Sequence, residues 1–170
     1  MSKKVYYGLQ NQAEIVSAAR RAVRTFGGGD KAVSMLVGTA CTETDMGTFK
    51  DKHPEKLGVG LNQFDLIRFK DLQTRTRRDN ANVFYKEYGV SLIDLELEDL
   101  AYDPYLSMAC CRLAYILIPE AIPEDVEGQA EYWKTHWNTY AKNAKGTPDE
   151  YLRDWFNHNP YRRMMTLNCA

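Results

Sequence analysis

The chain has almost no excess charge of either sign. Its 22 lysines and arginines stand against 23 aspartates and glutamates, so the formal net charge is −1. Proteins that bind nucleic acid through its phosphates usually carry a strong basic field or a basic patch. The balance therefore argues against nucleic acid as a partner, and it provides no general attraction toward an anionic cell wall.

Long hydrophobic runs are also missing. A helix needs roughly 20 consecutive apolar residues to cross a bilayer, and no stretch of the chain approaches that length. The first residues, MSKKVYYGLQNQ, contain two lysines but no apolar segment behind them. We therefore expect no membrane span and no Sec signal peptide, and a protein that is made in the cytoplasm.

Cysteine and histidine are scarce, and neither is spaced like a set of metal ligands. The cysteines are Cys41, Cys110, Cys111 and Cys169. The adjacent pair at 110 and 111 falls in one expected helix, where two neighbours cannot easily form a disulfide with each other. No CxxC pair or Cys/His spacing typical of zinc occurs, and the three histidines are far apart. We expect small buried thiols in a reducing compartment, with no metal and no cofactor.

What the sequence does contain is a large share of hydrophobic residues at helical spacing. They make up 44% of the 170 residues, which suffices for one domain with a substantial core. Apolar positions that recur every three and four residues predict six helices. Their ranges are 9–26, 31–44, 66–78, 104–118, 127–143 and 147–156. The prediction is a single, mainly α-helical domain over 1–170, with a core at 9–157 and a C-terminal tail at 158–170.

Two segments fit the helical pattern poorly. The range 50–63 holds a proline, two glycines and mixed charges, which predicts a loop or a short extended segment. The range 81–103 is ambiguous and is compatible with a helix that is broken at Gly89.

Capping residues mark several helix starts. Asp30 follows three glycines and is expected to be the N-cap of the second helix. Pro104 suits the first turn of the most apolar helix. Thr147, Pro148 and Glu150 have the order of a capping box with proline at the first helical position.

The stretch TACTETDMGTF, at 39–49, places an acid at the edge of an apolar helical face. That face carries Val33, Leu36, Val37 and Ala40. Glu43 follows Leu36 by seven residues, so it lies roughly 20° from it on a helical wheel, at the flank of the buried face. Partial burial and the negative end of the helix dipole both disfavour an anion there, and we expect them to raise the pKa of Glu43. A glutamic acid that stays protonated near neutral pH can act as a general acid; the alternative is a glutamate that reaches solvent from a helix edge.

A second segment, GVGLNQFD at 58–65, gives this acid a context. An apolar helix that ends in glutamate, then a loop, then a G-[LIV]-x-Q stretch resembles the lysozyme-like lytic transglycosylases and goose-type lysozymes. In that family the glutamate is catalytic and a segment such as GLMQ lines the sugar cleft. The resemblance implies that Glu43 is the catalytic residue. It also implies that the turn binds glycan through Gly60, Leu61, Asn62 and Gln63, with Asn62 in place of the usual methionine.

Two later segments extend the resemblance in the expected order. YDPYLSMACCRLAYIL, at 102–117, is similar to the family's DPxxNIxxGxxYL helix, with Ser107 on the usual asparagine and Cys111 on the usual glycine. WKTHWNTYAKNAKGTP, at 133–148, is similar to a segment in which an aromatic residue precedes asparagine. There the resemblance implies that Trp137 and Asn138 contact the substrate.

The departures concern detail: Thr44 replaces the serine that commonly follows the glutamate, and the last segment lacks its glycine. Trp133, Trp137 and Tyr140 recur at helical spacing, which is typical of a core stripe. Sugar clefts also use aromatic faces as stacking platforms, so Tyr140 is a further candidate for substrate binding.

The nearest other acids are Asp45 and Asp51, the candidates for a second catalytic carboxylate. An inverting hydrolase needs a second carboxyl group about 6.5–9.5 Å from the first, to act as a base. The helical wheel points neither aspartate toward the Glu43 cleft, which favours solvated or capping roles. A lytic transglycosylase needs no second acid, because the C6 hydroxyl of its substrate attacks the anomeric carbon.

The sequence therefore predicts a lysozyme-like domain with a substrate cleft. The expected activity is that of a lytic transglycosylase, which cleaves the β-1,4 bond between N-acetylmuramic acid and N-acetylglucosamine in peptidoglycan. The alternatives are a muramidase that uses water and a catalytically inactive lysozyme-like structural protein. A compact domain of this kind without a signal peptide is typical of bacteriophage virion or lysis proteins. The expected partners are peptidoglycan strands and other virion proteins, and the expected place of action is the periplasmic cell wall.

Overall fold

The computed structural model describes residues 3–50, 58–139 and 144–158. Within these ranges the chain folds into seven α-helices and one short 3-10 helix, without a strand. The helices are α1 (Ala13–Phe26), α2 (Gly29–Thr44), α3 (Leu66–Arg75), α4 (Arg78–Tyr88), η1 (Leu97–Ala101), α5 (Pro104–Ile116), α6 (Val126–His136) and α7 (Pro148–Asn157). The prediction of a single all-helical domain is confirmed for these residues. No helix in them combines the length and hydrophobicity needed to cross a membrane.

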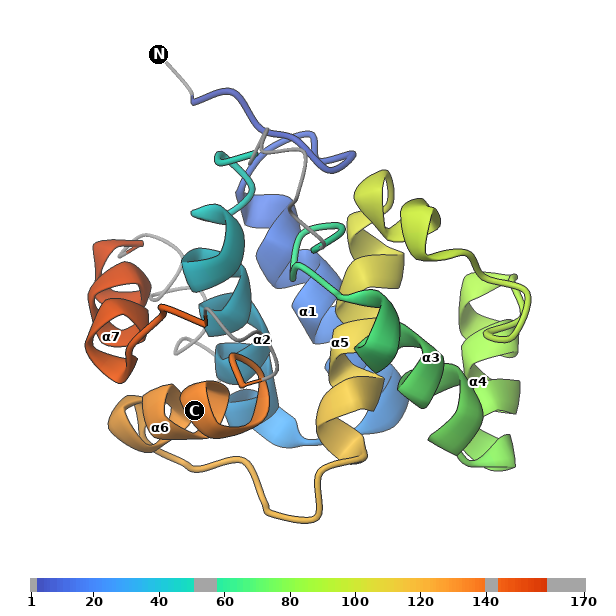
Figure 1. Cartoon of the computed structure of the whole chain (residues 1–170). Helices are drawn as coiled ribbons and strands as arrows, with labels where there is room; N and C mark the ends of the chain where they lie inside the picture. Colours follow the sequence, from blue (N-terminus) through green and yellow to red (C-terminus); the bar gives the residue numbers. More distant parts are fainter. Residues whose placement is uncertain (1–2, 51–57, 140–143, 159–170) are drawn as a thin grey trace.

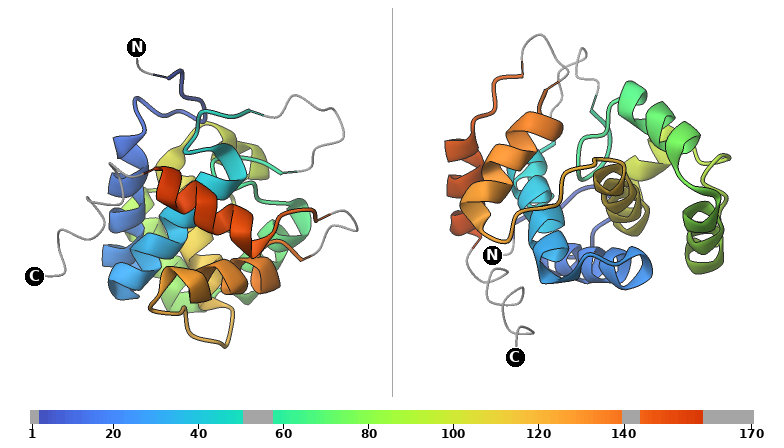
Figure 2. Two further views of the ribbon diagram at one scale, coloured as in Figure 1. Left: turned by 90° about the vertical axis from the view of Figure 1, so that its left-hand side faces the viewer. Right: turned by 90° about the horizontal axis from the view of Figure 1, so that it is seen from below.

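The helices form two groups around a central layer. In Figure 1, α2 and α5 occupy the middle of the molecule, and α1 packs against both. Helix α7 packs on α2 and on α6, whereas α3 and α4 lie beyond α5 on the opposite side. In the right view of Figure 2, seen from below, α6 and α7 lie on one side of the central helices and α3 and α4 on the other. Helix α2 thus contacts α7 and α6 as well as α1 and α5.

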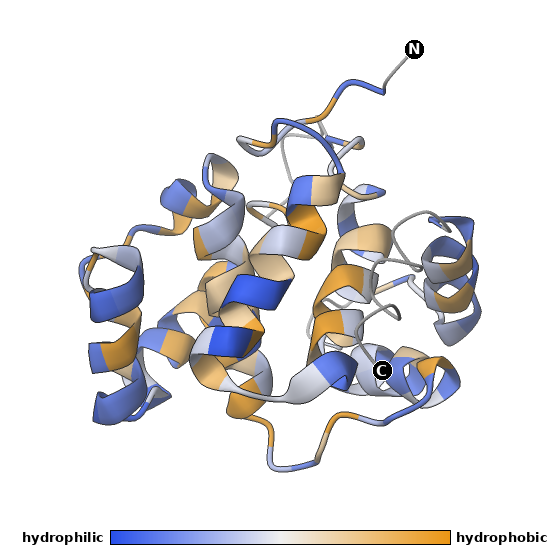
Figure 3. Cartoon of the chain, turned by 180° about the vertical axis from the view of Figure 1, so that it is seen from behind, coloured by the Kyte–Doolittle hydropathy of each residue, from blue (hydrophilic) through white to orange (hydrophobic). Residues whose placement is uncertain are grey.

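The core follows the periodicity of the sequence. Val33, Leu36, Val37 and Ala40 are all buried, as the helical wheel predicted. Helix α1 presents the buried small residues Ala18, Ala19 and Ala22, and small side chains at a helix contact let the two backbones approach closely. In Figure 3, hydrophobic segments gather on the central helices and hydrophilic segments predominate on the helices at the edges.

Local capping signals place the helix starts well where the side chain does the capping. The Asp103 carboxylate accepts hydrogen bonds from the N–H groups of Tyr105 and Leu106, so α5 begins at Pro104. The capping box of Thr147 and Glu150 is formed at the start of α7. Helix α4 ends at Tyr88, and the φ of 74° at its C-cap, Gly89, suits a residue without a Cβ.

Some predicted bounds are wrong. Asp30 is not the N-cap of the second helix, because α2 already begins at Gly29 and Asp30 lies in its first turn. The first helix begins at Ala13 rather than at 9. By contrast, the break considered at Gly89 is confirmed, because α4 ends at Tyr88 and is followed by a connection and η1.

The predicted helix at 127–143 ends early, at His136. The side chain of Trp137 turns into the core. The centroid of its ring lies 5.2 Å from that of Phe64 and 5.0 Å from that of Tyr115. Arg68 donates to the carbonyl oxygens of His136 and Trp137, which the helix end leaves without helical partners. Tertiary contacts therefore override the helical pattern at this point.

Gly38 lets α7 pack directly on α2. A Cβ atom at this position would meet the Oη atom of Tyr151, and it would lie 2.5 Å from Tyr151 Cζ and 3.0 Å from Trp155 Cδ1. Both rings are buried. The absence of a side chain at Gly38 therefore sets the distance between the helix that carries Glu43 and the helix opposite.

We expect Gly38→Ala to lower the free energy of unfolding by about 1–3 kcal/mol, because the new methyl group must displace Tyr151 or Trp155. The better helix propensity of alanine offsets up to about 1 kcal/mol of this loss. Thermal unfolding followed by circular dichroism measures the difference. Adding Tyr151→Phe removes the hydroxyl that the methyl group meets and should recover part of the stability. A Gly38→Ala protein as stable as its parent would show that the α2–α7 contact is looser than described.

Candidate functional site

Glu43 lies in the last turn of α2, half-buried, and its carboxylate is held from another helix. The indole N–H of Trp133, on α6, donates a hydrogen bond of 3.2 Å to Glu43 Oε1. This bond favours the ionised carboxylate and so acts against the two effects that the sequence suggested, burial and the helix dipole. The flank position predicted for Glu43 on the helical wheel is confirmed.

Glu43 opens into a pocket of about 420 Å³ between the end of α2 and the α6–α7 pair. Helix α2 contributes Cys41 and Thr42 beside Glu43, and Phe49 lies on the segment that follows. Trp133, Asn138 and Gly146 form the α6 side of the pocket, and Glu150, Arg153 and Asp154 form the α7 side. A half-buried acid that faces a cavity of this size has room for a ligand to approach its carboxyl group.

The turn at 58–65 lies beside the end of α2. Val59 and Phe64 form a two-residue bridge with hydrogen bonds of 2.8 and 2.9 Å, which closes residues 60–63 into a tight turn. The hydroxyl of Thr44, the residue after Glu43, lies 2.9 Å from the carbonyl oxygen of Leu61 and 3.1 Å from that of Ala40. A hydroxyl has one proton, so it donates to one of these carbonyls at a time.

The side chains of this turn face inward. Leu61 and Asn62 are fully buried, and Gly60 is confined because an added Cβ atom would lie 2.5 Å from the Leu100 carbonyl oxygen. Gln63 folds back on its own turn, where its Nε2 donates to the Gly60 carbonyl oxygen at 2.8 Å. None of these residues is among the described residues that line the Glu43 pocket. Direct contact of 60–63 with a glycan therefore stays a prediction.

The two residues that the resemblance implied on the last segment have different places. Asn138 lines the pocket beside Glu43, and its Oδ1 atom accepts a hydrogen bond from Lys134. Trp137 is buried, and its indole N–H donates to the carbonyl oxygen of Asn62, which ties the end of α6 to the turn. Trp133 and Trp137 belong to the core, as the default interpretation of the stripe predicted, and Tyr140 lies outside the described residues.

Asp45 lines the Glu43 pocket, although the helical wheel pointed it away from the cleft. The helix ends at Thr44, and Asp45 adopts a left-handed conformation with φ 48° and ψ 52°, so the wheel no longer describes its direction. Its carboxylate lines the same pocket as Glu43. Asp45 is the C-cap residue of α2 and is exposed, as a capping or solvated role requires, whereas its role as a second acid stays a prediction. Asp51, the other candidate second acid, lies outside the described residues.

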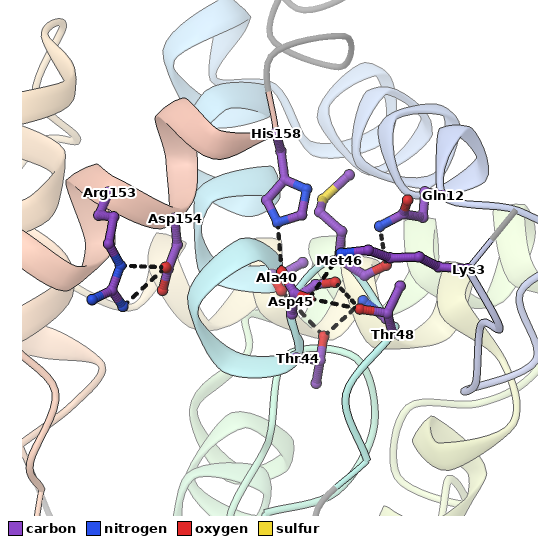
Figure 4. Close-up of polar contacts among 11 residues, drawn as sticks. Lys3, Gln12, Ala40, Thr44, Asp45, Met46, Thr48, Arg153, Asp154 and His158 are labelled. Atoms are coloured by element: carbon purple, nitrogen blue, oxygen red, sulfur yellow. Dashed lines mark hydrogen bonds and ion pairs between the residues drawn. The ribbon is translucent and has the colours of Figure 1, made fainter. Parts of the chain in front are cut away.

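The Asp45 carboxylate joins three segments of the chain (Figure 4). Its Oδ1 lies 2.8 Å from Nε2 of the buried His158, at the end of α7. Its Oδ2 accepts a hydrogen bond of 2.8 Å from the Thr48 hydroxyl and lies 3.7 Å from the Lys3 ammonium group. These contacts fix the backbone directly after Glu43 to the N-terminal segment and to α7.

Helix α7 adds charged residues that the sequence gave no reason to select. Burial raises the pKa of the Asp154 carboxyl group, the negative charge of Asp45 acts in the same direction, and Arg153 acts against both. Arg153 also pairs with Asp154 at 3.1 Å. With Glu150, four carboxyl groups and one guanidinium group line the described part of the pocket. Only the packing of α7 on α2 brings these residues to Glu43.

The described cysteines are all buried free thiols. Burial is the main cause that raises the pKa of Cys41, Cys110 and Cys111, which keeps them in the unreactive thiol form. The described ranges contain no group of three or more side chains suited to hold a metal ion.

Comparisons of the chain with protein-family models, with curated proteins and with solved structures find no match. Any assignment of function therefore rests on the residues and geometry described above.

Proposed function

We propose that the protein cleaves the glycan strands of peptidoglycan as a lytic transglycosylase of lysozyme-like fold, with Glu43 as general acid and base. One observation carries the proposal: the Glu43 carboxyl group, in the last turn of a buried helix, opens into a cavity of about 420 Å³ and is held there by the Trp133 indole. A solvent-reaching glutamate on a helix edge would need neither the cavity nor the buried donor.

Contacts between the segments that carry the family resemblance support the same proposal. The turn at 58–65 receives a hydrogen bond from Trp137, and its neighbour in space is Thr44. Asn62 and Ser107, the two positions that depart from the family's usual methionine and asparagine, contact each other: the Ser107 hydroxyl donates to Asn62 Oδ1 at 3.1 Å. Two substitutions that form a mutual contact are compatible with an unchanged backbone arrangement.

The proposed reaction uses one carboxyl group twice. Protonated Glu43 donates its proton to the glycosidic oxygen as the bond from that oxygen to C1 of N-acetylmuramic acid breaks. The ionised carboxylate then takes the proton from the C6 hydroxyl of the same muramic acid, and the C6 oxygen forms a bond to C1. The ring holds this hydroxyl near C1, which lowers the entropic part of the barrier. The products are a 1,6-anhydro muramic acid end and a free hydroxyl on N-acetylglucosamine.

A muramidase that uses water is the second candidate, and one observation favours it. Asp45 and Asp154 line the same pocket as Glu43, so a second carboxyl group is available to activate a water molecule. A catalytically inactive lysozyme-like structural protein is the third candidate, but such a protein has no use for an acid that opens into a cavity. As part of the proposal, the protein acts on the periplasmic cell wall as a virion or lysis protein of a bacteriophage.

We expect Glu43→Gln to reduce cleavage of purified peptidoglycan by about 10²–10⁴-fold, because the amide is nearly isosteric but cannot donate the proton. A zymogram and a turbidity assay measure the loss. Glu131→Gln is the matched control, because it makes the same change on an exposed position of α6. The control should cleave at the rate of the parent and both variants should unfold at the parent's temperature. A Glu43→Gln protein with full activity would show that Glu43 is not the catalytic acid.

The products separate the two enzymatic candidates. If the C6 hydroxyl is the nucleophile, mass spectrometry of the soluble fragments should show muropeptides lighter by one water than the products of hydrolysis. Digestion by a known muramidase provides the hydrolysed reference. Fragments that carry only reducing-end muramic acid would identify water as the nucleophile. In that case Asp45→Asn and Asp154→Asn are the next variants to assay.

A further inference from the structure

The hydrogen bond between Trp133 and Glu43 joins a rigid donor to the acid. Only 1% of the surface of residue Trp133 is exposed. It packs against Tyr151, with ring centroids 5.7 Å apart, and a Cβ atom added to Gly146 would lie 2.5 Å from its Cη2 atom. The indole is therefore enclosed by α7 on one side and by the segment before α7 on the other. Its N–H group reaches Glu43 Oε1 at 3.2 Å from a fixed position.

We propose that Trp133 is the positioning residue of Glu43: its indole N–H holds Oε1 and so sets the orientation in which the carboxyl group faces the pocket. The geometric part of this inference stands on the contact alone. Its catalytic consequence rests on the proposed function.

The chemistry of the indole explains why it suits this role. An indole N–H donates a hydrogen bond but cannot accept one, so Trp133 neither takes nor supplies a proton in the reaction. Oε1 can accept this bond whether the carboxyl group is neutral or ionised. The bond is stronger to the anion, so it assists the step in which Glu43 has given up its proton.

Other titratable groups lie around the Glu43 pocket on the neighbouring elements. Asp45 after α2 and Glu150, Arg153 and Asp154 on α7 line the same pocket. Lys134 on α6 bonds Asn138, which also lines it, and the neutral Cys111 thiol on α5 is influenced by Glu43. The nearby carboxylates favour the neutral form of Glu43, whereas Arg153 and the indole N–H favour the ionised form. Removal of the indole N–H should therefore move the protonation midpoint of Glu43 to higher pH.

Nuclear magnetic resonance can test the contact without any substrate. The chain has three tryptophans, so the proton–nitrogen correlation spectrum contains three indole N–H signals, and Trp133→Phe identifies one of them. We expect the Trp133 signal to shift in a single step as Glu43 titrates, and this step to disappear in Glu43→Gln. In Asp154→Asn, the matched change at another acid of the pocket, the step should remain. A Trp133 signal that titrates identically in Glu43→Gln would overturn the proposal.

Kinetics tests the consequence. Trp133→Phe keeps an aromatic ring but removes the donor, and we expect it to lower kcat about tenfold or more with little change in KM, because Glu43 is no longer held. A general acid must be protonated, so kcat falls as the pH rises through the protonation midpoint of Glu43. This fall in kcat, the alkaline limb of the pH profile, should move to higher pH in Trp133→Phe. Trp155→Phe, the same change in a buried ring of α7, should leave the limb in place.

The outcomes separate the two proposals. If the parent protein does not cleave peptidoglycan but the Trp133 signal still depends on Glu43, the contact stands and the proposed function fails. If the parent cleaves peptidoglycan and Trp133→Phe, folded, keeps both its kcat and its alkaline limb, the positioning role fails and the function stands. Should Trp133→Phe not fold, Trp137→Phe and Trp155→Phe identify the other two indole signals, and the comparison of the parent with Glu43→Gln still decides the contact.

Discussion

The structure of the candidate site depends on how α2 ends. The last carbonyl groups of a helix have no intrahelical partners and must be satisfied by whatever follows. Here three successive residues, Asp45, Met46 and Gly47, have positive φ values, and only one of them is a glycine. One distant and one local contact hold this left-handed run: Tyr6 N–H donates to the Gly47 carbonyl oxygen, and Gly47 N–H donates to the hydroxyl of nearby Thr44. The same run stops the helix one residue after Glu43 and so exposes its carboxyl group to the cavity.

The sequence predicted those features that are decided locally. The flank position of Glu43 follows from the spacing of its own helix, and the starts of α5 and α7 follow from Pro104 and from the capping box of Thr147. Features that depend on packing could not be predicted in this way. The early end of α6 results from the insertion of Trp137 between Phe64 and Tyr115, two residues from distant parts of the chain.

The site shows the same division between local and tertiary causes. Glu43 and Asn138 were selected from sequence patterns, and the fold brings both to one pocket. The partner of Glu43 was not, because a tryptophan on an apolar stripe carries no sign that its N–H group will point at a carboxylate on another helix. Asp154 likewise enters the pocket only because Gly38 lets α7 approach α2 so closely. The family resemblance suggested roles for these residues. The hydrogen bonds and charges around them come from tertiary packing.

The Asp45 carboxylate connects the site to the N-terminal segment and to the end of α7. It contacts Lys3 near the beginning of the chain and His158 at the end of α7, and Gln12 donates to the Met46 carbonyl oxygen next to it. Contacts between exposed side chains, such as Asp45 and Lys3, resist local opening less than a buried core does. The arrangement around Glu43 is therefore governed by the free energy of local opening at these contacts, which can be far smaller than the free energy of global unfolding. The site can lose its order while the helical core stays folded.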